Sequence, residues 1–190
     1  MLRVMLVDEK PERSLELERA LAEAGYEVVA TVTGRDDLRE AIERLGPDVI
    51  IVDMQSPSRD VLESMRRIHE ERPRPIVMFV DETDADSIRS AVRAGVSAYV
   101  VDGLKGRSVR PVVEVAIARF QEFQALRSEL ESARSSLADR KLVERAKGIL
   151  MRRRNLDEEN AYALLRKSAM DRKRKLVEVA REVIAMSELL

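Results

Sequence analysis

The chain has 190 residues, of which 45% are hydrophobic and 36% are charged, with a formal net charge of −1 at pH 7. The absence of Cys from the sequence excludes disulfides and thiolate metal sites, and no apolar run approaches the roughly 20 residues that a membrane-spanning helix needs. The N-terminal apolar stretch turns acidic too early for a signal peptide, so we expect a cytoplasmic protein that contacts no membrane.

The first 110 residues alternate short apolar runs with amphipathic segments. Five of the runs predict β-strands: VMLVD (4–8), VVATV (28–32), VIIVD (49–53), PIVMFV (75–80) and AYVV (98–101). The run at 49–53 is continuously apolar, as in a central parallel strand that is buried on both faces. Apolar residues at helical spacing follow the strands, for example over 35–45. Five β/α repeats predict an α/β domain over 1–110 with a doubly wound, five-stranded parallel sheet.

Acidic residues stand at the ends of two predicted strands. Asp8 and Glu9 end the first strand, and Asp53 ends the third. Because sites in such sheets lie at the carboxyl ends of the strands, these three acids should converge at one edge. Carboxylates that lie so close repel one another, and a hard cation such as Mg²⁺ would relieve the repulsion. The alternative is that they are ordinary N-cap residues of the helices that follow.

A long helix is predicted over 111–138. Pro111 suits a first helical turn after a Ser108 N-cap. An apolar stripe that we call the seam repeats at spacings of 3, 4, 3 and 4, and it consists of Phe123, Leu126, Leu130, Ala133 and Leu137. This spacing predicts a coiled coil in a parallel homodimer. The alternative is a helix that packs its stripe on its own domain.

The last part of the chain, 139–190, predicts three short helices with basic turns. Residues 1–110 hold 17 Lys or Arg against 22 Asp or Glu, whereas residues 141–175 hold 12 against 5. Arg152, Arg153 and Arg154 fall at the first turn between helices, where the helix dipole alone favours cations. The run 172–175 falls at the start of a helix, where cations gain nothing from the dipole. The excess of cationic side chains at both turns therefore indicates a polyanionic binding partner, most simply a nucleic acid.

Residues 1–110 resemble the receiver domain of response regulators, which has a flavodoxin-like fold. VDEKP (7–11) is similar to the paired-acid motif of the family, and Asp53 in VIIVDMQSP stands where the family has its phosphate-accepting aspartate. Tyr99 matches the switch aromatic. Val80 and Asp102 depart from the family, which has Ser or Thr at the first of these positions and Lys at the second. The resemblance, together with these departures, implies a degenerate receiver domain that is controlled by contact with another protein more than by phosphorylation.

Residues 141–184 resemble the ANTAR domain, an RNA-binding module of transcription antiterminators. The similar features are AKGIL (146–150), the Ala-Tyr pair at 161–162, Leu-Leu-Arg at 164–166, Ala169 and LVEVA (176–180). Within the family the chain is similar to nitrate-assimilation regulators of the NasT type. This resemblance implies a dimer that binds paired hairpins in nascent leader RNA, and a nitrate-sensing partner protein that sequesters it. The residues expected to contact RNA are Lys147, Arg152, Arg153, Arg154, Arg166, Lys167, Arg172, Lys173, Arg174 and Lys175.

Two other classes of function stay open on the sequence. Three helices and a dimer would also suit a helix-turn-helix response regulator on DNA, and a protein that only titrates a partner would need no nucleic acid. An enzyme is not expected. The single His, His69, lies on a helix away from the acidic edge, and the sequence has no Gly-rich phosphate loop.

Overall fold

A five-stranded parallel sheet forms the centre of the N-terminal part of the chain. The computed structural model describes residues 1–8, 11–33, 37–101 and 109–188. The strands follow one another in space in the order β2-β1-β3-β4-β5. Their bounds are β1 (Arg3–Asp8), β2 (Glu27–Val32), β3 (Val49–Met54), β4 (Ile76–Val80) and β5 (Ala98–Val101). This is the order of flavodoxin-like sheets, so the predicted fold class is confirmed.

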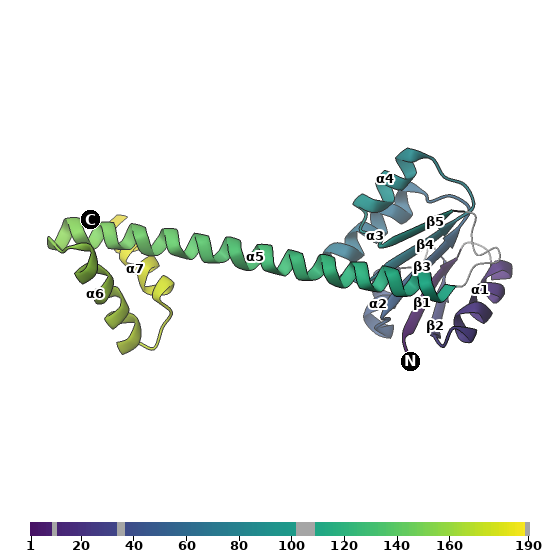
Figure 1. The fold of residues 1–190 in the computed structure, drawn as a ribbon, viewed down its shortest axis with the longest axis horizontal. Coiled ribbons are helices and arrows are strands. Elements are labelled where there is room, and N and C mark those ends of the chain that lie inside the picture. The colour runs from purple at the N-terminus through teal and green to yellow at the C-terminus, as the bar shows by residue number, and fades with distance from the viewer. Residues whose placement is uncertain (9–10, 34–36, 102–108, 189–190) are drawn as a thin grey trace. The chain divides into compact units, whose positions relative to one another are not determined.

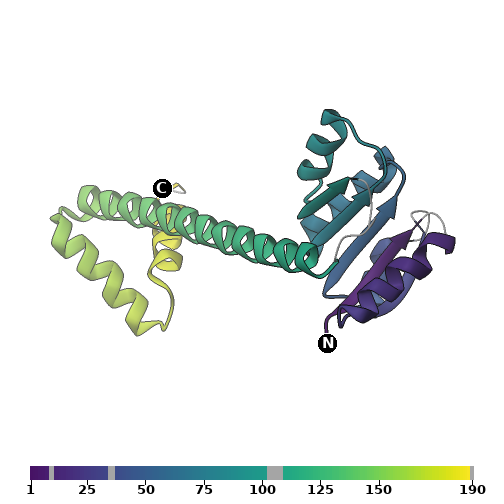
Figure 2. The same cartoon turned by 45° about the vertical axis from the view of Figure 1, so that its right-hand side comes forward.

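Helices cover both faces of the sheet, as Figures 1 and 2 show. One face packs against α2 (Leu38–Leu45), α3 (Arg59–Glu71) and α4 (Ala85–Arg93). The other packs against α1 (Pro11–Glu23) and the first turns of α5 (Val109–Arg154). Successive side chains of a strand enter opposite layers, so the strands are apolar on both faces.

Polar signals set the ends of α2. The Asp37 side chain accepts hydrogen bonds from the backbone N–H groups of Arg39 and Glu40, which makes it the N-cap. Gly46 ends the helix with φ 56°, a left-handed conformation that favours glycine. The sequence predicted this helix over 35–45. The helix begins at Leu38, because the backbone of Asp37 is extended, so the prediction was wrong at residue 37. Residues 35 and 36 lie outside the described residues.

One helix of 46 residues, α5, carries the segments that the sequence divides into a linker and a first C-terminal helix. The chain forms two compact units, Met1–Gln124 and Ala125–Leu190, and the division between them falls within α5. None of the described helices is long and apolar enough to serve as a transmembrane span.

The C-terminal unit is a small helical domain. It consists of the later turns of α5, α6 (Glu158–Asp171) and α7 (Leu176–Glu188). The buried core draws on all three helices and comprises Ala146, Ile149, Leu165, Ala169, Val179, Ala180 and Ile184. The turns after α5 and α6 each contain one non-glycine residue in the left-handed region, Asn155 with φ 52° and Lys173 with φ 51°. The three predicted C-terminal helices are therefore present, although the first continues α5 without a break.

Candidate functional site

The acidic edge of the sheet is formed by the last residue of β1 and the fifth of β3. Asp8 and Asp53 are aligned partners in the register of these neighbouring strands, so their side chains lie on the same face. Both are nearly buried, with exposed fractions of 4% and 5%. Glu9, the third predicted acid, lies outside the described residues. The structure therefore brings together two of the three predicted acids.

The aspartate pair suits a hard cation. Mg²⁺ is bound in proteins through one or two carboxylates, with water or phosphate oxygens completing its octahedron. Two buried carboxylates side by side would also gain from a cation that neutralises their repulsion. Among the described residues, no group of three acidic or histidine side chains is placed to hold a metal ion. Mg²⁺ at Asp8, Glu9 and Asp53 stays a prediction.

Two other predicted receiver residues, Val80 and Tyr99, lie in neighbouring strands. Val80 ends β4 and is fully buried between Met54 and Val101 in the register of the sheet. The Tyr99 hydroxyl lies 2.9 Å from the Thr83 hydroxyl, and the two share a hydrogen bond. Asp102 lies outside the described residues. Thr83, which follows β4 by three residues, is a hydrogen-bond partner of the predicted switch tyrosine that the sequence motif did not reveal.

The seam on α5 is exposed. Leu126, Leu130 and Leu137 each have 50–60% of their surface in solvent, and Ala133 is exposed as well. At 3.6 residues per turn they lie on roughly the opposite side of α5 from Leu142 and Ala146, which pack on α6 and α7. Within the C-terminal unit, the stripe therefore has no cover from its own helices.

Phe123, the first residue of the seam, has a contact in its own unit. Its ring centroid is 6.0 Å from that of His69 on α3, with the two planes tilted by 44°. The ring is still 53% exposed. We therefore place the freely exposed part of the seam at 126–137.

Lys147 on α5 is enclosed by acidic and aromatic groups. Its ammonium donates to Glu158 Oε1 at 2.7 Å and pairs with Glu144 Oε1 at 2.9 Å, and it lies 5.9 Å from the centre of the Tyr162 ring. The hydrogen bonds to Glu158 and Glu144 raise the pKa of Lys147, and the Lys147 ammonium lowers the pKa of Glu158. With 7% of its surface exposed, Lys147 joins α5 to the start of α6. We therefore leave it out of the proposed RNA surface, although the sequence placed it there.

The second basic turn has partners on α7. Arg172 donates to Glu182 at 2.9 Å, and Arg174 donates to Glu178 at 3.0 Å and also to Glu182. These hydrogen bonds raise the pKa of Arg174 and lower that of Glu178. The helix dipole gives no reason for cations at this turn. The structure supplies a reason for two of the four cations, Arg172 and Arg174, because their side chains link the turn to α7.

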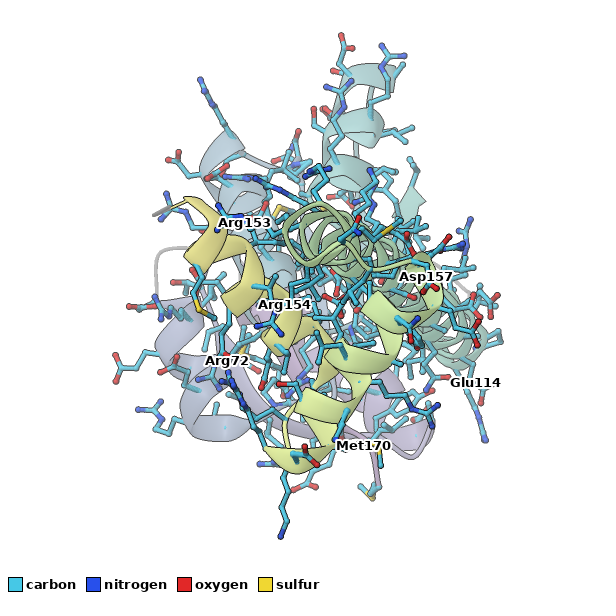
Figure 3. The ribbon with its side chains drawn as sticks, turned by 90° about the vertical axis from the view of Figure 1, so that its left-hand side faces the viewer. Arg72, Glu114, Arg153, Arg154, Asp157 and Met170 are labelled. Carbon is cyan, nitrogen blue, oxygen red and sulfur yellow. The ribbon has the colours of Figure 1, made fainter. Side chains whose placement is uncertain are left out.

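Of the three arginines at the first basic turn, one contacts α7 and the other two point into solvent. Arg153 donates to the backbone carbonyl of Ser187 at 3.0 Å, near the end of α7. Figure 3 shows Arg153 close to α7, with Asp157 at one end of α6 and Met170 near the other. Arg152 and Arg154 are exposed. Arg153 therefore caps the Ser187 carbonyl in the last turn of α7, as cations at helix C-termini commonly do.

Six of the ten predicted RNA contacts are exposed, and their side chains form neither a hydrogen bond nor an ion pair with any other described residue. They are Arg152, Arg154, Arg166, Lys167, Lys173 and Lys175. All six lie in the C-terminal unit: Arg152 and Arg154 in the last turn of α5, Arg166 and Lys167 on α6, and Lys173 and Lys175 between α6 and α7.

Comparison with known proteins identifies both parts of the chain. Residues 4–110 match the response regulator receiver domain, and residues 131–184 match the ANTAR domain. The chain is 32% identical to the transcriptional regulatory protein PdtaR of Mycobacterium tuberculosis over 182 residues. These aligned residues make up 96% of this chain and 89% of that protein.

Two further relatives match over parts of the chain. The nitrate regulatory protein of Klebsiella oxytoca is 34% identical over 88 residues, which are 46% of this chain and 22% of that protein. The crystal structure of a response regulator receiver domain protein from Clostridium thermocellum superimposes with a TM-score of 0.55 at 20% identity, covering 65% of this chain and 99% of that one. This likeness confirms the fold of the N-terminal unit. The chain belongs to the response regulators that join a receiver domain to an ANTAR domain.

Proposed function

We propose that this chain is a transcription antiterminator that binds paired hairpins in nascent leader RNA as a homodimer. The observation that carries the proposal is the set of six exposed cations, which form no ion pair with the described residues, on a unit that matches the ANTAR domain. Neutralising RNA phosphates and releasing their counterions is the main source of affinity for such a surface. By holding hairpins that compete with a terminator, the protein keeps the polymerase transcribing.

The exposed seam supports the dimer. Leu126, Leu130 and Leu137 present half or more of their surface to water, and covering each would contribute about 1 kcal/mol. A second copy offers the same stripe at the same spacing, which is the requirement of a coiled coil. Because the seam faces away from the core of α5, α6 and α7, pairing through it leaves the six cations of each copy accessible. Two linked RNA-binding units then bind two hairpins with avidity.

The receiver provides the control. Asp8 and Asp53 form an acidic pair that Mg²⁺ fits, but Val80 places a buried methyl-bearing side chain where the family has a hydroxyl. A phosphoryl group at Asp53 therefore lacks one of the groups that hold it in the family. We propose that a partner protein, rather than phosphotransfer, sets the activity of the regulator. The nitrate-assimilation resemblance and the partial match with a nitrate regulatory protein favour a nitrate-sensing partner.

A gel-shift titration tests the function. The full-length protein is titrated on the leader RNA of its own operon, on the same RNA with scrambled hairpin loops, and on a DNA duplex of the same sequence. The proposal expects binding to the native leader and at least tenfold weaker binding to the other two. Preference for the duplex would favour a DNA-binding response regulator. Failure to bind any of the three at low salt would favour a protein that only titrates a partner.

A further inference from the structure

An exposed side of α6 combines an aromatic ring with a cation. Tyr162, Arg166 and Met170 are spaced four residues apart, so they line one side of the helix. Tyr162 and Met170 are 43% and 67% exposed, although the core of the unit lies close by on Ala161, Leu165 and Ala169. The helix therefore leaves an aromatic and a thioether in solvent beside an arginine that has no acidic partner among the described residues.

The Tyr162 ring borders a shallow hollow whose other walls are charged. Lys147, Glu158 and Glu159 line the rest of it. Lys147 is held by Glu158 and Glu144, and its ammonium lies 5.9 Å from the ring centre, so the ring rests against a fixed cation. This arrangement preorganises the ring while leaving almost half of it open.

The lining selects the kind of group that fits the hollow. A phosphate would meet the carboxylates of Glu158 and Glu159 and be repelled. A nucleobase is uncharged, presents a flat π-face to the tyrosine, and in adenine, guanine and cytosine carries N–H donors that carboxylates accept. Arg166 stands one helical turn from Tyr162, within reach of the phosphate attached to such a base.

We infer that Tyr162 stacks on one unpaired base of the RNA loop, with the adjoining phosphate bound by Arg166. This inference rests on the proposed function and names how the same surface recognises a loop rather than a helical stem. Stacking needs a base that is splayed out of its helix, so Tyr162 would read the presence of an unpaired nucleotide, whereas the cations attract any backbone.

The test compares three variants on the leader hairpin at several salt concentrations. Tyr162→Leu removes the ring and keeps an apolar side chain, Tyr162→Phe keeps the ring, and Arg166→Ala removes one cation. We expect Tyr162→Leu to weaken binding by about 5- to 100-fold with an unchanged salt slope. Tyr162→Phe should stay within about threefold of wild type. Arg166→Ala should lower the log–log salt slope by about 0.7 to 0.9.

A fluorescence readout separates stacking from a loss of fold. 2-Aminopurine is placed at each loop position in turn, and its emission is measured with saturating wild-type or Tyr162→Leu protein. Quenching at one position by the wild type alone would support the inference. Equal binding and equal fluorescence with both proteins would overturn it, as would a Tyr162→Phe loss as large as that of Tyr162→Leu. Failure of the wild type to bind the hairpin at all would instead overturn the proposed function, and the inference with it.

Discussion

The Lys147 ammonium lies 2.7 Å from Glu158 Oε1, and this contact ties α5 to the first turn of α6. Glu144 holds the same ammonium from the preceding turn of α5. Removing the ammonium would leave two carboxylates without their shared partner, next to the Asp157 N-cap that starts α6. A side chain that the sequence assigns to RNA thus has a structural task.

Lys147→Met should loosen α6 without changing the receiver domain. The substitution keeps an apolar stem of similar length and deletes the charge, so the attachment of α6 to α5 weakens. Hydrogen–deuterium exchange of the full chain should be several-fold faster in Glu158–Asp171 and unchanged in β1 to β5. Lys141→Met is the matched control, because Lys141 is exposed on the same helix. Equal exchange in the two variants would show that the contact is dispensable.

The contact between Lys147 and Glu158 also predicts that the stability of the folded state depends on pH in the acidic range. Lys147 lowers the pKa of Glu158 below its ordinary value of 4.5, so the ionised carboxylate favours the folded state. That stability is present above pH 4.5 and is lost as the pH falls through the lower, folded pKa. The thermal midpoint of wild type should therefore exceed that of Glu158→Gln near neutrality, and the gap should narrow below about pH 4.5. A gap that stays constant down to pH 3 would contradict this role for Glu158.

Leu130→Glu should disrupt the homodimer. A carboxylate in the middle of the seam would be buried in both copies at once, which weakens the dimer by about 100-fold or more. Sedimentation analysis should show a monomer at concentrations where wild type is dimeric. Ser128→Glu, which adds the same charge at an exposed position off the seam, is the control. Affinity for a two-hairpin RNA should fall by at least tenfold, while affinity for a single hairpin stays the same.

A monomeric Leu130→Glu protein that binds two-hairpin RNA like the wild type would show that the seam has no part in recognition. Dimeric behaviour of Leu130→Glu would show instead that another surface pairs the chains.

Much of the fold follows from local sequence patterns. Continuous apolar runs such as VIIVD marked the buried strands within one or two residues of their observed ends, because burial on both faces leaves little choice of residue. Asp8 and Asp53 were predicted to meet because parallel strands place equivalent ends at one edge, and the register pairs them. The seam was visible as a 3-4 repeat, and three of its leucines are exposed. The coiled-coil homodimer stays a prediction.

The details of the basic surface could not be read from spacing. Arg172 and Glu182 are ten residues apart, and Arg153 and Ser187 are 34 apart. Contacts at these separations depend on how α7 folds back, whereas helical spacing reveals pairs only three or four residues apart. The exposure of Tyr162 could not be predicted either, since a motif residue on an amphipathic helix is exposed or buried according to the packing of its neighbours. The predictions for Glu9 and Asp102 fall outside the described residues.

Asp53→Ala should leave the regulator functional. If a partner protein sets its activity, removing the side chain at the expected phosphate-accepting position should change RNA affinity by less than about twofold and preserve the response to the partner. A ligand can signal through such a partner protein only if it binds two states of that partner with different affinities. Wild type should also label weakly with a small phosphodonor and Mg²⁺, because Val80 supplies no hydroxyl. Loss of activity in Asp53→Ala, combined with strong labelling of wild type, would establish conventional phosphotransfer.

The most direct test of the central claim is read-through in a single-round transcription reaction with purified RNA polymerase and the leader of the native operon. Wild-type protein should raise the fraction of transcripts that pass the terminator. The double variant Arg152→Ala with Arg154→Ala should need a higher concentration for the same effect, since each lost phosphate contact lowers the affinity. Arg153 is left intact in this variant because it caps α7. Wild-type protein that binds the leader and leaves termination unchanged at every concentration would contradict antitermination.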